Sequence, residues 1–304
     1  MNDVLEPLES GLLTVSKIHK IHYATYGNPK GIPLLCFHGG PGGGFKDKYI
    51  ALTDMDKYYT IVFDQRGCGA SIPVAEIIEN TCMDTVNDAL KLLKYLHVKK
   101  CVVMGFSYGT TLAFAFAIKH PNKIIKMFLS SIFIPLNFND WFFGGGAGKV
   151  LSKAYKNFVS VIKNTDPIEL LKEYDSAIID RKKEIAAALV NWESELFKGL
   201  KTVTLCSVND ISNKILANKR VFLHYVAHDM FGIGLWIMQN IYKIKYIPIF
   251  IVHGKLDLII PVSTVYKILE ILPNVTLKMM DQEGHVGNAI TTQIYSCMNA
   301  DILP

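Results

Sequence analysis

The sequence lacks any long run of like charge. Its 304 residues contain 32 lysines and arginines and 27 aspartates and glutamates, a net charge of +5, and no five like charges stand in succession. Binding to nucleic acid or to a membrane surface through charge needs a concentrated basic segment. We therefore expect neither nucleic acid nor a membrane among the partners of this chain.

Cysteine is also sparse, and the cysteines have neither CxxC spacing nor the density of a disulfide scaffold. They are Cys36, Cys68, Cys82, Cys101, Cys206 and Cys297. The start, Met1 to Glu6, has no basic segment and no apolar stretch of a signal peptide. The most apolar long window, 221–241, is interrupted by charged and polar residues and is too polar for a membrane span. We expect free thiols and a cytoplasmic location, and the oligomeric state is open.

What the sequence does contain is an alternation of short apolar runs with helical patterns. Apolar residues make up 50% of the chain, enough for a large core. The predicted strands of the first half are 18–26, 33–37, 60–63, 102–106 and 125–130. Thr81 can cap a helix whose apolar residues follow at helical spacing. This alternation predicts the α/β class, with a mostly parallel sheet flanked by helices.

The alternation stops at Pro135 and returns at Ile247. Residues 136–245 are typical of helices joined by polar turns, with one helix starting at Asp166 and Pro167. A strand at 247–252, a helix at 262–271, a strand at 275–280 and a helix at 289–299 are expected afterwards. We predict two domains, a core of 1–135 and 246–304 and an inserted helical cap of 136–245 over the active site. The aromatic side chains of the cap are expected to be core residues.

The centre of the predicted core is the stretch Gly105-Phe106-Ser107-Tyr108-Gly109, between an apolar run and a helix-like segment. A serine at a sharp turn from strand to helix is in a strained conformation, and side chains at both glycine positions would collide with neighbouring backbone. Such a turn exposes the Ser107 hydroxyl at the carboxyl end of the sheet and places the Tyr108 N–H at a helix N-terminus. The alternative is a simple turn, which the flanking strand and helix disfavour.

A second glycine-rich stretch, His38 to Gly44, directly follows the predicted strand 33–37. Its backbone can approach a ligand closely, and we expect the Gly40 N–H to join the Tyr108 N–H as an oxyanion hole. The alternative is a flexible loop. Asp64 and Arg66 follow the next strand, and we expect them to brace loops by hydrogen bonds.

A serine nucleophile needs a base, and the base needs an orienting acid. In an α/β-hydrolase fold these follow the serine in the order Asp, His, each just past a strand end. Asp257 and His285 satisfy this order and placement. We interpret His38 and His253 as structural. The predicted catalytic residues are therefore Ser107, Asp257 and His285, and this chemistry needs no metal and no cofactor.

Together these motifs resemble one family. The segments 38–44, 64–69 and 105–109, with His253-Gly254, Asp257 and Gly284-His285, resemble the proline iminopeptidases (prolyl aminopeptidases) of the α/β-hydrolase superfamily. The resemblance covers nearly the whole chain. It implies removal of an N-terminal proline from peptides by the triad named above.

The resemblance also implies substrate-binding residues in the cap. Glu193 corresponds to one of two family glutamates that hold the free amine, whereas Phe222 stands where the second is expected. In the apolar proline pocket Phe133 matches, Phe142 is similar and Val226 replaces an aromatic ring. Trp141 lies in a segment that is similar to one of the family.

Three functions remain open. The leading one is a serine aminopeptidase that releases N-terminal proline, or a small apolar residue, from small peptides with a free N-terminus. The second is an esterase or amidase for an uncharged acyl substrate, which Phe222 and Val226 favour. The third is a ligand-binding protein without turnover, which the complete triad disfavours.

Overall fold

The computed structural model describes residues 5–46, 50, 53–198 and 203–300. Eight strands form one sheet in the order β1-β2-β4-β3-β5-β6-β7-β8. The strands are β1 (Glu9–Thr14), β2 (Lys20–Gly27), β3 (Ile32–Phe37), β4 (Tyr58–Phe63), β5 (Cys101–Phe106), β6 (Ile124–Ser130), β7 (Ile249–Gly254) and β8 (Val275–Met280). The strands from β4 to β8 in this order pair in parallel, and β2 pairs antiparallel with both β1 and β4. The predicted mostly parallel sheet is confirmed.

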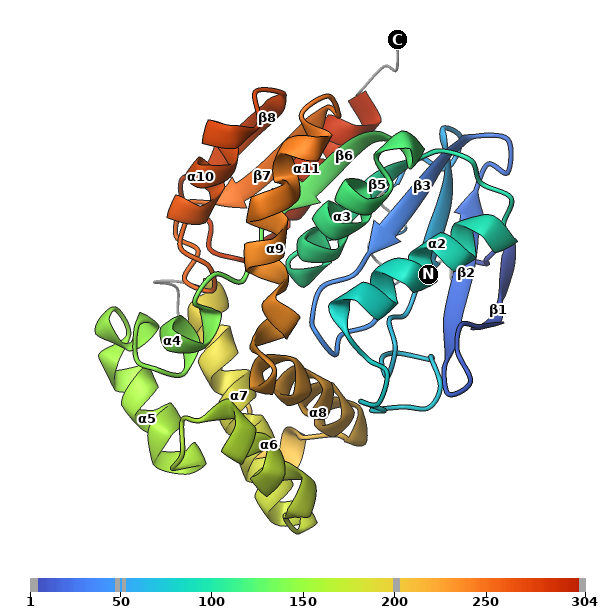
Figure 1. Cartoon of the computed structure of the whole chain (residues 1–304). Coiled ribbons are helices and arrows are strands. Elements are labelled where there is room, and N and C mark those ends of the chain that lie inside the picture. Colours follow the sequence, from blue (N-terminus) through green and yellow to red (C-terminus); the bar gives the residue numbers. More distant parts are fainter. Residues whose placement is uncertain (1–4, 47–49, 51–52, 199–202, 301–304) are drawn as a thin grey trace.

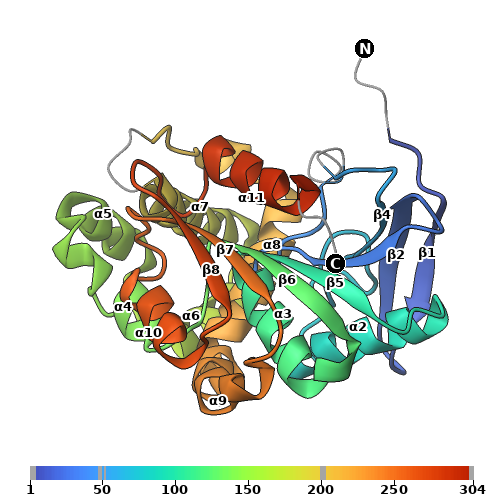
Figure 2. The same ribbon diagram turned by 90° about the horizontal axis from the view of Figure 1, so that it is seen from above.

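The central strands are apolar because helices cover both faces of the sheet. Figure 2 shows α11 (Asn288–Ala300) on one face and α2 (Cys82–Tyr95), α3 (Tyr108–Lys119) and α10 (Ser263–Ile271) on the other. The predicted cap of α2 is present, since the Thr81 side chain accepts from the Asp84 N–H and the Asp84 carboxylate accepts from the Thr81 N–H. Each face of the sheet therefore carries its own apolar core cluster.

The first strand was not expected from the sequence. β1 is an edge strand with the sequence Glu-Ser-Gly-Leu-Leu-Thr, and none of its residues is fully buried. It lacks the β-branched or aromatic residues at alternating positions that mark a strand. Antiparallel pairing with β2, from Glu9 opposite Thr25 to Thr14 opposite Lys20, creates the strand instead.

Between β6 and β7 the chain forms a series of helices. They are α4 (Phe138–Phe142), α5 (Ser152–Ile162), α6 (Pro167–Ser176), α7 (Ile179–Lys198), α8 (Asn213–Ala227) and α9 (Ile233–Asn240). Figure 1 shows α4 to α8 gathered beyond the carboxyl ends of the strands. α9 instead packs against α3, so the last part of the predicted cap segment lies on the face of the sheet.

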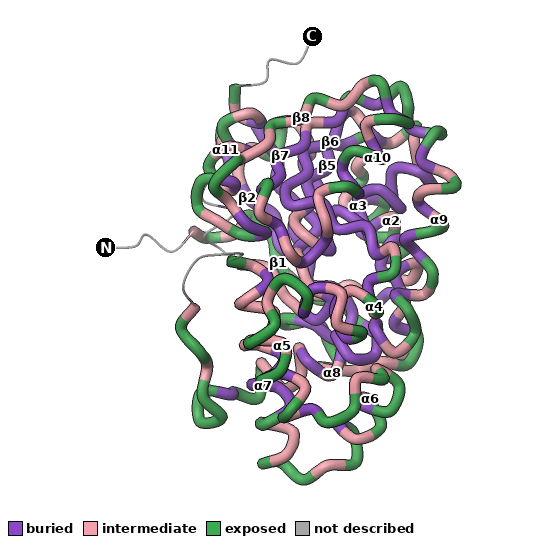
Figure 3. Tube along the Cα trace, turned by 90° about the vertical axis from the view of Figure 1, so that its left-hand side faces the viewer, coloured by how far each residue is buried: buried purple, intermediate pink, exposed green. Residues whose placement is uncertain are grey.

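Burial differs between these layers. Figure 3 shows buried stretches running through the sheet, whereas α5 and α6 have only two fully buried side chains each. In contrast, α7 and α8 bury one side each, including Trp192 and Phe222. α7 and α8 thus form the inner layer of the inserted segment, the layer that faces the carboxyl ends of the strands.

Candidate active site

Ser107 stands at the turn between β5 and α3. Its φ of 52° and ψ of −126° are strained for a residue with a side chain. A Cβ at Gly105 would lie 2.7 Å from the Gly109 carbonyl oxygen, and one at Gly109 would overlap the Phe37 carbonyl. Both glycines are therefore required by their surroundings, as the sequence predicted. The turn holds the serine side chain clear of the backbone around it.

Three side chains from three loops form a continuous chain of hydrogen bonds. Ser107 Oγ lies 2.7 Å from His285 Nε2, and His285 Nδ1 lies 2.6 Å from Asp257 Oδ2. The other carboxylate oxygen, Asp257 Oδ1, accepts from the backbone N–H groups of Ile259 and Ile260 at 2.8 and 3.2 Å. With its proton on Nδ1, His285 donates to Asp257 and can accept the serine proton at Nε2.

A second histidine, His253, lies beside the same carboxylate. Its Nε2 is 3.4 Å from Asp257 Oδ2, and its Nδ1 accepts from the Ile132 N–H at 3.1 Å. Burial lowers the pKa of His253 to about 4, against the attraction of Asp257, which raises it. It is therefore neutral near pH 7. It has no contact with Ser107 among the described hydrogen bonds, in agreement with its interpretation as structural.

The position of His285 is fixed from the inserted segment as well as from the sheet. Its N–H donates to the Phe197 carbonyl at 2.9 Å, and its own carbonyl accepts from the Ser131 hydroxyl. The Phe197 ring also stacks on the imidazole, with ring centres 5.4 Å apart and an interplanar angle of 13°. Phe197 ends a long helix far from His285 in sequence, and no motif in the sequence indicated this contact.

The glycine-rich loop passes directly over the serine. A Cβ at Gly39 would lie 3.3 Å from the Ser107 Cβ. The loop is braced by Gln65, whose backbone N–H donates to His38 Nε2 at 3.0 Å and whose side-chain amide donates to the His38 carbonyl at 2.8 Å. Burial lowers the pKa of His38. His38 thus supports the loop, and Gly40 lines the same cavity as Ser107.

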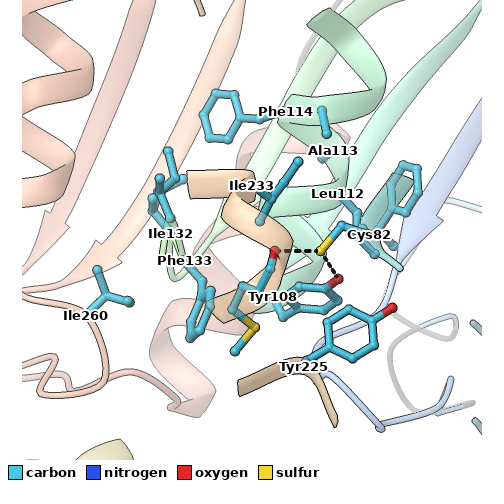
Figure 4. Packing of buried hydrophobic residues seen from close by; sticks show 14 of the residues in the cluster. Cys82, Tyr108, Leu112, Ala113, Phe114, Ile132, Phe133, Tyr225, Ile233 and Ile260 are labelled. Carbon is cyan, nitrogen blue, oxygen red and sulfur yellow. Dashed lines mark hydrogen bonds between the residues drawn. The ribbon is translucent and has the colours of Figure 1, made fainter. Parts of the chain in front are cut away.

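The Tyr108 side chain points away from Ser107, and Tyr108 is not among the described residues that line the cavity. Figure 4 shows its side chain packed among core residues, and its hydroxyl lies 3.2 Å from Cys82 Sγ. Because Tyr108 begins α3, its N–H belongs to the first turn, where helix N–H groups have no partner within the helix. The role of the Gly40 and Tyr108 N–H groups as an oxyanion hole stays a prediction that this placement supports.

Asp64 and Arg66 brace loops, as expected. Asp64 accepts from the Phe45 and Ala70 N–H groups at 2.7 and 2.9 Å. Arg66 donates to both carboxylate oxygens of buried Asp88, at 2.6 and 2.8 Å. Neither residue is among those that line the cavities described next.

Two adjoining cavities open at Ser107. The larger, of about 1110 Å³, runs from the glycine-rich loop to α7 and α8. The smaller, of about 30 Å³, shares part of this lining, and its walls are mostly aromatic. Gly40, Ser107, Glu193, Phe197 and Phe222 line both. Ser107 therefore lies where a large cavity meets a small, mostly aromatic one.

The predicted substrate-binding residues divide into two groups. Phe133, Phe142, Phe222 and Glu193 line the smaller cavity. Trp141 and Val226 are not among the described residues lining either one. The Trp141 indole N–H donates to the Leu258 carbonyl at 2.8 Å, and Val226 is fully buried in the core.

Glu193 has a partner that the sequence did not indicate. The Lys219 ammonium donates to Glu193 Oε2 and lies 5.5 Å from the centre of the Phe222 ring. Lys219 is only 4% exposed. The two residues are on different helices, α7 and α8, so only the packing of these helices brings the charges together. Lys219 and Phe222 are three residues apart, one helical turn, which is the single local signal.

No helix in the described ranges is by itself long and apolar enough to cross a membrane; α8 and the segment 229–244 together meet the length and composition criteria, but with a bend of 59°. Over the same ranges, no group of three or more His, Cys, Asp or Glu side chains could hold a metal ion.

Comparison with known proteins gives consistent results. Residues 32–289 match the model of the alpha/beta hydrolase fold. A probable proline iminopeptidase of Leptolyngbya boryana is 32% identical over 92% of this chain and 89% of its own length. A proline iminopeptidase of Arabidopsis thaliana is 33% identical over 93% and 77%. Among solved structures, a proline iminopeptidase-related protein from Thermus thermophilus aligns with a TM-score of 0.58 and 18% identity, over 96% of this chain and 92% of its own. VinJ aligns with a TM-score of 0.66 and 16% identity, over 96% and 97%.

Proposed function

The chain belongs to the proline iminopeptidases, hydrolases with the α/β-hydrolase fold, and on that premise we propose that it is a serine aminopeptidase that releases an N-terminal proline, or a small apolar residue, from short peptides. The observation that carries the proposal is the chain of hydrogen bonds from Ser107 through His285 to Asp257, at 2.7 and 2.6 Å. A cytoplasmic location and the division into a core and a cap stay predictions.

In this proposal Ser107 Oγ bonds to the carbonyl carbon of the first residue, and its proton passes to His285 Nε2. Asp257 stabilises the resulting imidazolium, and the Gly40 and Tyr108 N–H groups stabilise the oxyanion. The carbon–nitrogen bond then breaks, and His285 gives its proton to the leaving amine. Water hydrolyses the acyl-enzyme by the same steps in reverse, which frees Ser107.

The smaller cavity supports an apolar first residue. Phe133, Phe142 and Phe222 line it beside Ser107, and all three are at most 5% exposed. Aromatic walls of this kind favour a compact apolar ring or a short side chain through burial of apolar surface. The amine of the same residue would lie near Glu193, the one carboxylate among the described residues of the lining.

A second candidate is an esterase or amidase for an uncharged acyl group. The observation that favours it is the Lys219 ammonium, which already pairs with Glu193. A carboxylate that is already paired with an ammonium within the protein attracts a substrate amine less strongly.

Steady-state hydrolysis of a proline arylamide, a leucine arylamide and a short-chain nitrophenyl ester tests these alternatives. We expect turnover of the proline arylamide, and a loss of at least about 10⁴-fold in kcat/KM in Ser107→Ala. Turnover of the ester alone would refute the aminopeptidase and leave the esterase. Turnover that survives Ser107→Ala would refute both.

A further inference from the structure

We propose that Lys219 is a specificity-determining residue, whose ammonium takes the place of a substrate cation on Glu193 and so relaxes the requirement for a free N-terminal amine. This inference rests on the proposed function, since it concerns the amine end of the same cavity.

The first support is the balance of buried charges in the cavity. Glu193 is the only carboxylate among the described residues that line either cavity, whereas Lys46, Lys198, Lys214 and Lys219 line the larger one. Of these lysines only Lys219 is buried. The interior of the site thus holds one carboxylate and one ammonium that neutralise one another.

The second support is that the Lys219 side chain is held in place. Next to it, the Asn218 side-chain amide donates to the Gly42 carbonyl at 2.7 Å, and a Cβ at Gly42 would overlap the Asn218 carbonyl. α8 is therefore packed directly on the glycine-rich loop above Ser107. The Lys219 ammonium donates to Glu193 and lies over the face of the Phe222 ring, which attracts a cation.

An N-terminal amine has a pKa of about 8 and is mostly protonated at neutral pH. To reach Glu193, such an ammonium must share the carboxylate with Lys219 or displace it, and the two like charges repel one another. An acylated or otherwise uncharged nitrogen meets no such repulsion. The pair therefore lowers the affinity for the charged form and leaves the uncharged form unaffected.

Binding of prolinamide and of N-acetylprolinamide to Ser107→Ala protein, measured by titration calorimetry, tests this without turnover. We expect the parent to prefer prolinamide by less than about 10-fold, and Lys219→Met to tighten prolinamide alone by at least about 10-fold. Adding Glu193→Gln should cancel that gain, because the gain needs the freed carboxylate.

Two variants serve as controls. Lys219→Arg keeps the charge, and Lys214→Met removes an exposed charge from the same helix and cavity. Both should leave the preference within about 2-fold of the parent, because neither frees Glu193.

A parent preference above about 100-fold, or a Lys219→Met variant with an unchanged or smaller preference, would overturn the inference. Equal loss of both ligands would also overturn it, since that marks a purely structural lysine. Failure of the proposed function has a different signature. Neither the wild type nor the Lys219→Met variant, both with Ser107 in place, would then cleave a prolyl arylamide, whatever the calorimetry gives.

Discussion

The two walls of the cavity are built in different ways. The sheet wall, which we define as Ser107 and His285 together with Asp257, comes from loops at strand ends. Ser107 and His285 line the cavity, Asp257 is not among the described lining residues, and each of the three side chains has a hydrogen bond with another member. The helix wall, which we define as Glu193, Phe197, Lys219 and Phe222, comes from α7 and α8. The residues of the sheet wall carry out the proposed hydrolysis, whereas the residues of the helix wall would contact the substrate and set selectivity. Substitutions in the first should therefore change kcat, and those in the second should change selectivity.

Asp257→Asn should give the largest effect. The amide cannot accept the His285 Nδ1 proton as a carboxylate does, so the imidazole loses both its tautomer and its charge stabilisation. We expect kcat to fall by about 10⁴-fold with little change in KM. Steady-state kinetics on the best substrate measures this.

Asp281→Asn is the matched control, because Asp281 is an exposed residue paired with Lys255 at the surface. It should retain kcat within about 2-fold. If Asp257→Asn kept kcat within about 10-fold, Asp257 would not be the orienting acid.

Gly109→Ala should show how little space surrounds the turn that carries Ser107. Its new methyl would overlap the Phe37 carbonyl, and backbone cannot move aside cheaply. We expect a loss on the order of 3 kcal/mol in the free energy of unfolding, measured by denaturant titration.

Gly11→Ala is its control. A Cβ there meets only the Tyr23 ring, at an ordinary 3.5 Å. It should change the free energy of unfolding by less than about 0.5 kcal/mol. Equal stability of both variants would mean that the turn between β5 and α3 can accept a methyl group without strain.

This contrast explains what the sequence could predict. The strand-to-helix turn at 105–109, the glycine-rich loop and the strand ends are local patterns in the sequence. The need for glycine at 105 and 109 follows from the tight backbone packing at that turn. The contacts of Lys219 with Glu193 and of Phe197 with His285 join residues far apart in the chain. They depend on how α7 and α8 pack, which no periodicity specifies. β1 was missed for a related reason, since pairing rather than composition defines it.

His253→Gln should change how the free energy of unfolding depends on pH. The pKa of His253 is about 4 in the folded protein because of burial, against 6.5 for an ordinary histidine. Between these values the unfolded chain binds more protons, so this contribution to stability is fully present above pH 6.5 and is lost as the pH falls toward 4. The loss amounts to no more than about 3 kcal/mol.

We therefore expect the free energy of unfolding to fall less steeply from pH 6.5 to 4 in His253→Gln than in the wild type, in urea titrations at several pH values. His97→Gln, at an exposed position, is the control and should follow the wild type. Identical slopes for the wild type and His253→Gln would show that His253 is protonated in the folded protein too.

Phe197→Ala tests a contact between the two walls. The Phe197 ring stacks on the His285 imidazole, and only the ring is lost, because the hydrogen bond to the His285 N–H comes from the Phe197 backbone. Stacking of this kind contributes about 1 kcal/mol, so kcat should fall by about 5-fold through poorer alignment of the imidazole. Phe231→Ala removes a similar stack, on His228, away from the triad, and should keep kcat within about 2-fold. If Phe197→Ala changed only KM, the helix wall would bind substrate without aligning the base, and the separation of chemistry from selectivity would be complete. A fall in kcat instead means that α7 takes part in both, so that changes in the inserted segment that alter selectivity also carry a cost in rate.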